Sequence, residues 1–110
     1  MERFEYRWPR FRINAPVRMT FWRSDISGRC VDISEEGMKV ECPQIDSAHS
    51  RGTVTVIHPA WTVEIAVQIA YSTPIHTGLK FIYRSDHERS MVARFVASLG
   101  YAVCTMPRST

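Results

Sequence analysis

The sequence contains no long hydrophobic run. A helix that crosses a membrane needs about 20 consecutive apolar residues, and polar or charged side chains interrupt every apolar stretch well before that length. Residues 1–5 carry charges at three positions and lack the apolar centre of a secretory signal. We therefore expect a cytoplasmic protein without membrane insertion.

Paired cysteines and clustered histidines are also missing. The three cysteines, Cys30, Cys42 and Cys104, form no CxxC spacing, and their number is odd. In the cytoplasm we expect reduced thiols rather than a disulfide between Cys30 and Cys42. The four histidines are scattered and form no HExxH pattern. These absences predict a protein without a metal site.

Signatures of catalysis are likewise absent. The sequence has no GxSxG elbow around a nucleophilic serine, no phosphate-binding P-loop and no GxGxxG dinucleotide fingerprint. Nothing in the pattern favours an enzyme or a cofactor, and we expect neither.

Positive charge is concentrated at the start of the chain. Residues 1–23 contain six arginines and no lysine against two glutamates, a net charge of +4 in a chain whose total is +3. Arginine presents a rigid planar fork that suits phosphate oxygens and base edges. The segment suggests an anionic, planar partner, although a solvated terminal charge run would have the same composition.

Most of the chain shows the alternation of half-buried strands. Val17, Met19 and Phe21 alternate with Arg18, Thr20 and Trp22. This alternation is typical of a strand with one buried face. A turn is predicted at residues 25–28. Further strands are predicted at residues 29–33, 38–42, 53–58, 63–69 and 79–83.

The period changes near residue 85. Residues 85–88 read Ser-Asp-His-Glu, a capping-box pattern at a helix start, and Gly100 suits the helix end. The apolar residues that follow at helical spacing are Met91, Val92, Phe95, Val96 and Leu99.

These patterns predict a mainly all-β fold, a small six-stranded antiparallel β-barrel with a C-terminal α-helix that covers one end or face. We divide the chain into a basic N-terminal arm (1–13), the barrel with its closing helix (14–100) and a tail (101–110).

The segment Asp-Ile-Ser-Glu-Glu-Gly at residues 32–37 lies between two predicted strands. Period two places Asp32 and Ser34 on the same face. Gly37 can adopt positive φ and allows another group to approach the backbone. A simple hairpin turn uses the same residue types, so the segment alone leaves both interpretations open.

Together with the arginine arm, this segment resembles the PilZ family. The family signature is an RxxxR arm followed, about one strand later, by [DN]xSxxG. Asp32, Ser34 and Gly37 match the second motif without a gap, and residues 7–18 look like the arm running into the first strand.

The end of the chain is also similar to that family. Residues 77–81 and the predicted closing helix look like the family's last strand and helix, so the resemblance covers about residues 3–99. It implies a bacterial receptor for cyclic di-GMP that signals to an effector protein and catalyses nothing. In this interpretation the arm folds over the ligand and becomes ordered.

The resemblance also implies a set of ligand contacts. Arginines of the arm would bind guanine and phosphate, Asp32 would accept from the guanine N–H donors, and Ser34 would add a bond or orient Asp32. The predicted ligand-binding residues are Arg7, Arg10, Asp32, Ser34 and Gly37, with Arg3, Tyr6 and Arg12 as further candidates.

Two positions depart from the family pattern. If Arg10 is the second arginine of the arm motif, the first falls on Tyr6, with Arg7 beside it. Glu35 and Glu36 fill the variable places of the second motif, where carboxylates are unfavourable beside a dianion unless they point away.

Two other functions stay open. A PilZ-like protein interaction module that has lost nucleotide binding would use Trp8, Phe11, Trp22 and Trp61 as a docking patch, although we expect Trp22 and Trp61 to pack in the core. The other is a small barrel that binds nucleic acid, which the basic residues and interleaved aromatics of the arm allow. DNA or RNA is nevertheless not the expected partner, because outside the arm the chain is nearly neutral.

Overall fold

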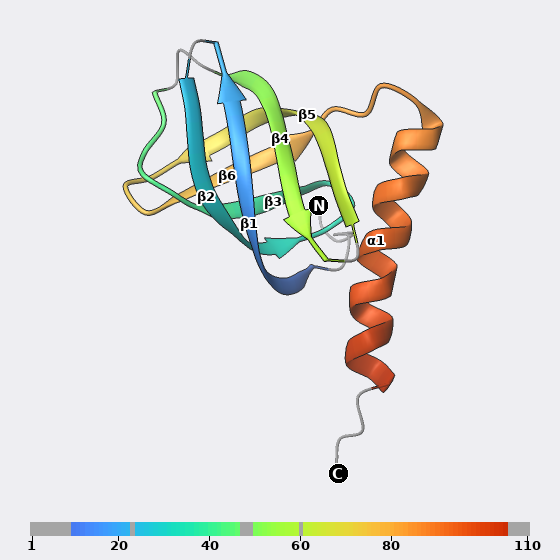
Figure 1. Cartoon of the computed structure of the whole chain (residues 1–110). Helices are drawn as coiled ribbons and strands as arrows, with labels where there is room; N and C mark the ends of the chain where they lie inside the picture. Colours follow the sequence, from blue (N-terminus) through green and yellow to red (C-terminus); the bar gives the residue numbers. More distant parts are fainter. Residues whose placement is uncertain (1–9, 23, 47–49, 60, 106–110) are drawn as a thin grey trace, which may run out of the picture.

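The protein folds as a closed antiparallel barrel with one helix at its side (Figure 1). The computed structural model describes residues 10–22, 24–46, 50–59 and 61–105. The barrel order is β1-β2-β3-β6-β5-β4. The elements are β1 (Phe11–Phe21), β2 (Ser24–Ile33), β3 (Gly37–Glu41), β4 (Arg51–His58), β5 (Trp61–Ser72), β6 (His76–Phe81) and α1 (Asp86–Thr105). The predicted fold class is confirmed.

The barrel interior follows from the alternation in the strands. Val17, Met19 and Phe21 of β1 are at most 2% exposed, as predicted. Each of the other five strands also contributes inward-facing apolar side chains to this core. Burial of one such side chain stabilises the fold by about 1.5–3 kcal/mol.

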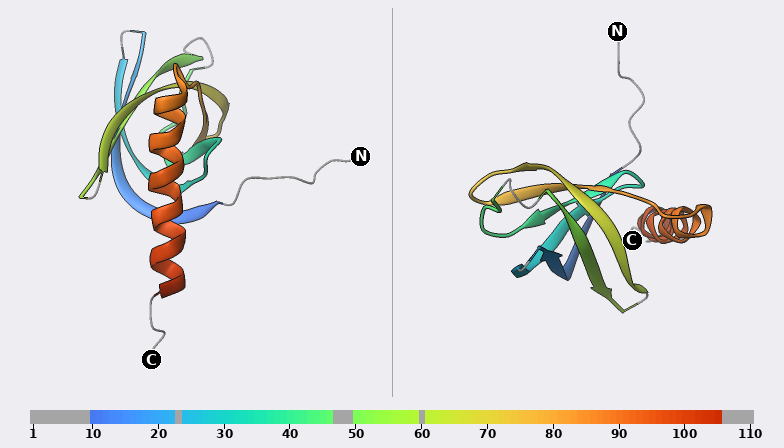
Figure 2. Two further views of the ribbon diagram at one scale, coloured as in Figure 1. Left: turned by 90° about the vertical axis from the view of Figure 1, so that its right-hand side faces the viewer. Right: turned by 90° about the horizontal axis from the view of Figure 1, so that it is seen from above.

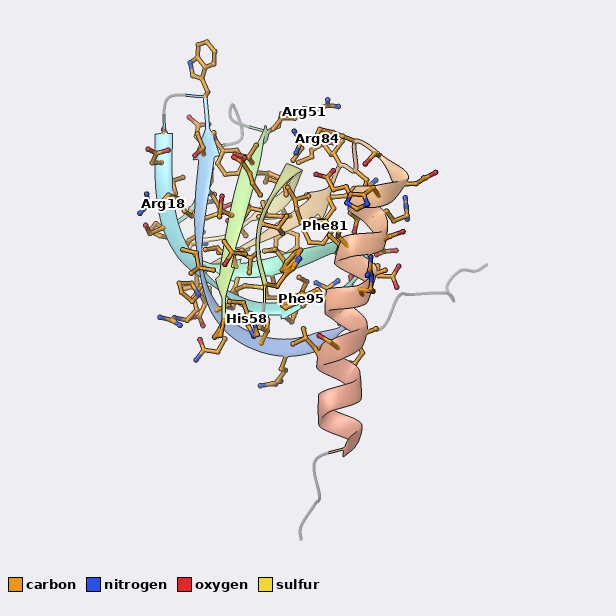
Figure 3. The ribbon with its side chains drawn as sticks, turned by 45° about the vertical axis from the view of Figure 1, so that its right-hand side comes forward. Arg18, Arg51, His58, Phe81, Arg84 and Phe95 are labelled. Carbon is orange, nitrogen blue, oxygen red and sulfur yellow. The ribbon has the colours of Figure 1, made fainter. Side chains whose placement is uncertain are left out.

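Helix α1 closes this core at the side of the barrel (Figures 1 and 2). The ring of Phe95 stacks on Trp61 at 4.3 Å between centroids and meets His58 edge-on at 5.2 Å (Figure 3). Val92 and Val96 are buried beside it, so the predicted apolar stripe and the packing of Trp61 are confirmed.

The prediction that Trp22 packs in the core is wrong. Trp22 lies in the connection between β1 and β2, has a φ of 25° and is 70% exposed. The predicted turn at residues 25–28 is also wrong. Those residues belong to β2 and pair with residues 17–20 of β1, so the chain turns earlier, between Phe21 and Ser24.

Other boundaries also shift. Strand β1 begins at Phe11, so residues 11–13 of the predicted arm belong to the barrel. Strand β6 begins and ends earlier than predicted. Helix α1 continues past Gly100 to Thr105, since one glycine costs a helix only about 1 kcal/mol.

The described cysteines are free thiols, as expected. Cys30 and Cys42 are both buried. Burial and the nearby Asp32 carboxylate raise the pKa of Cys30 to about 12, and its thiol donates to the Asp32 carbonyl over 3.4 Å. In the described ranges, no helix is long and apolar enough to cross a membrane.

The N-terminus of α1 uses half of the predicted capping box. The Ser85 hydroxyl accepts from the Glu88 amide at 3.1 Å. The Glu88 carboxylate does not return to Ser85 but accepts from the amide and guanidinium of Arg84, at 2.8 and 3.0 Å.

We expect Ser85→Ala to lower the free energy of unfolding by about 1 kcal/mol, because one amide of the first helical turn loses its acceptor. Urea unfolding measures the loss. Ser90→Ala, an exposed position within the same helix, is the matched control and should change stability by a few tenths of a kcal/mol at most. Equal losses in the two variants would contradict a capping role for Ser85.

Candidate functional site

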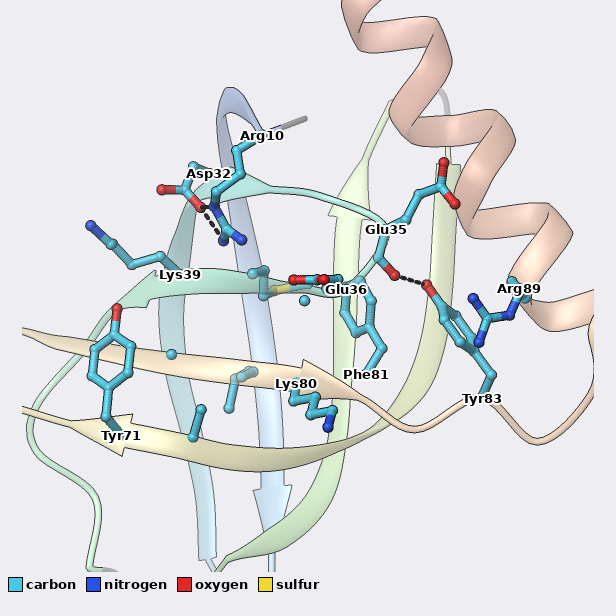
Figure 4. A pocket seen from close by; sticks show the side chains of 15 residues that line it. Arg10, Asp32, Glu35, Glu36, Lys39, Tyr71, Lys80, Phe81, Tyr83 and Arg89 are labelled. Carbon is cyan, nitrogen blue, oxygen red and sulfur yellow. Dashed lines mark hydrogen bonds and ion pairs between the residues drawn. The ribbon is translucent and has the colours of Figure 1, made fainter. Parts of the chain in front are cut away.

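Three of the predicted site residues meet at one edge of the barrel. The Arg10 guanidinium donates from Nε and Nη2 to Oδ1 of Asp32, at 3.0 and 2.6 Å (Figure 4). From Nη1 it donates to the Ser34 hydroxyl at 3.3 Å. The side chains of Arg10 and Asp32 are 40% and 23% exposed, so the pair remains open to solvent.

The pairing of β1 with β2 creates this meeting point. Phe11 is opposite Ile33 and Arg12 is opposite Asp32, so the residue before β1 lies beside the residue after β2. Bulges on both strands adjust the local direction of the side chains. In β2 the extra residue is Val31, which allows Cys30 to point inward and Asp32 to point outward.

The turn between β2 and β3 is held by its own hydrogen bonds. The Ser34 amide donates to the Gly37 carbonyl at 2.9 Å, and the Glu36 amide donates to the Ser34 hydroxyl at 3.0 Å. Ser34 is fully buried, and its hydroxyl also receives the Arg10 bond. Ser34 therefore links the arginine directly to the backbone of the turn.

Gly37 has a different role from the one its turn position suggests. No glycine in the described ranges has positive φ, so that part of the prediction is wrong. The close approach is confirmed, because a Cβ at Gly37 would lie under 3.0 Å from the Leu79 carbonyl oxygen on β6. Glycine is needed here so that β3 and β6 can pair.

A pocket of about 790 Å³ opens beside these residues (Figure 4). The outer face of β3, β6 and β5 contributes one side, and the turn and the start of α1 contribute the other. Four cationic side chains and three carboxylates line it. The charged lining residues are Arg10, Lys39, Lys80, Arg89, Asp32, Glu35 and Glu36.

Several lining residues were missed from the sequence, among them Lys39 and Tyr71. Lys39 lies opposite Asp32 on β3, and strict alternation with the buried Met38 would have indicated its outward position. Tyr71 packs its ring against Gly78, its partner on β6. A bulge between Ile69 and Tyr71 reverses the alternation, so the sequence pattern gave no signal for it.

A second tyrosine joins the turn to α1. The Tyr83 hydroxyl donates to the Glu35 carbonyl at 2.6 Å, and the Arg89 guanidinium lies 4.8 Å from the centre of its ring (Figure 4). Burial raises the pKa of Tyr83 to about 12. The hydroxyl therefore stays a donor throughout the neutral pH range.

Of the other predicted site residues, only Arg12 lies within the described ranges. Arg12 is exposed on β1 and does not line the pocket, although it lies opposite Asp32. Arg3, Tyr6 and Arg7 lie outside the described residues, as does Trp8 of the expected docking patch. The Glu35 carboxylate points toward α1 (Figure 4), whereas Glu36 is exposed at the pocket.

Within the described ranges, no three His, Cys, Asp or Glu side chains gather as metal ligands would. The pocket instead combines an arginine fork, a carboxylate and aromatic rings. These groups can hold a planar ligand that has both acceptors and donors and carries negative charge.

Comparisons with solved structures agree with this fold. The PilZ domain of Escherichia coli YcgR with c-di-GMP matches with a TM-score of 0.73 and 14% identity over 91% of this chain and 95% of that one. The PilZ domain of CeSA from a cellulose-synthesizing bacterium matches with a TM-score of 0.71 and 14% identity, over 84% and 98%. PlzA of Borreliella burgdorferi in complex with c-di-GMP matches at 0.60 and 15%, over 96% and 55%.

No curated protein matches the sequence. At such low identity, the solved structures establish the fold and leave the family to the sequence itself. The model of the PilZ domain family matches residues 3–98. Because this match spans most of the length of the chain, the chain belongs to the PilZ domain family.

Proposed function

We propose that this protein is a cyclic di-GMP receptor that catalyses no reaction. The observation that supports the proposal is the convergence of Arg10, Asp32 and Ser34 at the pocket edge, since the arginine and the carboxylate there complement the two edges of a guanine. Solved structures of PilZ proteins with c-di-GMP share this fold.

The chemistry of the pair matches guanine closely. An arginine fork donates to the O6 and N7 acceptors of guanine, and a carboxylate accepts from its N1–H and N2–H₂ donors. Both Arg10 bonds to Asp32 end on Oδ1, and no hydrogen bond from the described residues reaches Oδ2. Asp32 can therefore accept from a base while it still holds Arg10.

The magnitudes are adequate for a physiological receptor. Hydrogen bonds to charged groups contribute about 1.5–3 kcal/mol each, and micromolar affinity requires about 8 kcal/mol. Two such contacts provide a large part of that free energy. The pocket volume of about 790 Å³ lies within the range that small-ligand sites occupy.

The arm is the second part of the proposed mechanism. Residues 1–9 immediately precede Arg10 and contain Arg3, Tyr6 and Arg7. We propose that ligand binding orders this segment over the pocket, where its arginines contact phosphate and base. The change would present a new surface to an effector protein.

Titration calorimetry with cyclic di-GMP tests the proposal. We expect saturable binding with a dissociation constant in the micromolar range or below, and at least tenfold weaker binding of GMP, which offers a single base. Hydrogen exchange at saturation should slow at residues 2–8 if the arm closes. No heat from a folded sample would reject the receptor and favour an interaction module that binds only protein.

A further inference from the structure

The 34–37 turn is connected to α1 through one side chain. Tyr83 lies between β6 and α1, and its hydroxyl donates to the Glu35 carbonyl at 2.6 Å. On the helix side, the Arg89 guanidinium lies 4.8 Å from the ring centre. The Tyr83 ring is thus held by the turn at its hydroxyl and by the first turns of α1 at its face (Figure 4).

The same turn receives the candidate ligand residues on its other side. The Ser34 hydroxyl accepts from both the Arg10 guanidinium and the Glu36 amide. The two residues that flank Glu35 therefore belong to the same network as Arg10. A ligand that draws Arg10 away from Ser34, or that adds contacts to the turn, changes the position or rigidity of that carbonyl. The hydrogen bond between the Glu35 carbonyl and the Tyr83 hydroxyl connects such a change to α1.

Other contacts make this route rigid. The Phe81 amide donates to the Glu36 carbonyl at 2.8 Å, and the rings of Phe81 and Tyr83 pack at 5.8 Å between centroids. At the helix start, Arg84 is bound to Glu88 through its amide and its guanidinium. The linker from β6 to α1 therefore has little freedom to absorb a displacement of the turn.

We propose that Tyr83 is a positioning residue that couples ligand occupancy of the 34–37 turn to the stability of α1, which makes the helix an output element of the receptor. This inference rests on the proposed function for its ligand. It differs from closure of the arm, because it assigns the signal to the opposite end of the chain.

Hydrogen exchange of residues 86–96 at saturating cyclic di-GMP tests the coupling. In the wild-type protein we expect ligand to slow exchange of these amides by roughly two- to tenfold, the factor to which one hydrogen bond corresponds. Tyr83→Phe removes the hydroxyl and keeps the ring in place. At ligand concentrations that saturate this variant, the slowing in α1 should be lost.

The matched control is Tyr71→Phe, which removes a phenol hydroxyl from the same pocket but not from the route to α1. At saturation this variant should retain the response of the helix. A full response in Tyr83→Phe, or wild-type binding without any response in α1, would overturn the coupling and leave the receptor intact. Absence of wild-type binding would reject the proposed function itself and the coupling with it.

Discussion

Arg10→Ala is expected to weaken cyclic di-GMP binding at least 100-fold and to lower the thermal midpoint by only a few degrees. The guanidinium provides at least two contacts at about 1.5–3 kcal/mol each, and every 1.4 kcal/mol changes the dissociation constant tenfold. Its ion pair with Asp32 is partly exposed, at 40% and 23%. Such pairs stabilise a fold by at most about 1 kcal/mol, so function and stability should separate.

Calorimetry and a thermal melt of the same samples measure the two effects. Arg18→Ala is the matched control, because Arg18 is an exposed arginine of β1 that does not line the pocket. Arg10→Lys keeps the charge but cannot form the planar fork, so it should recover only part of the affinity. Wild-type affinity in Arg10→Ala would remove Arg10 from the site, and a large fall in the midpoint would assign it a structural role.

The barrel was predictable from the sequence because its strands bury one face. Val17, Met19 and Phe21 had to point to one side of β1, and the same constraint applies to Ile65 and Val67 of β5. The helix was predictable from its cap and its apolar stripe. The boundaries were harder, because β2 contains Asp25 and Gly28, residue types that usually mark turns.

The centre of the site was predictable for a different reason. Asp32, Ser34 and Gly37 lie in one short segment, so their proximity requires no long-range information. That Arg10 would reach them depended on the family resemblance and on the β1–β2 register, which no local pattern specifies. Tyr71 could not be placed, because a bulge breaks the alternation just before it.

Gly37→Ala should be the most destabilising small substitution at the site, with a loss of about 3 kcal/mol in the free energy of unfolding. The added Cβ would meet the Leu79 carbonyl, and backbone cannot rotate out of the way as a side chain can. Strands β3 and β6 would have to separate where Gly37 pairs with Lys80. At 4–8 °C per kcal/mol, the thermal midpoint should fall by roughly 15 °C.

Gly78→Ala gives the same chemical change two pairs further along the two strands, where Gly78 lies opposite Lys39. There the three atoms nearest to the added Cβ all belong to the ring of Tyr71, and Tyr71 is 47% exposed, so its ring can swing toward solvent. We expect a loss of about 1 kcal/mol or less. Equal losses in the two variants would mean that loss of glycine itself, rather than the backbone contact at Leu79, sets the cost. A larger loss in Gly37→Ala would show that the glycine of the motif is needed for β3 to pair with β6. Residues of these two strands line the pocket, so Gly37 would then be required for the shape of the site.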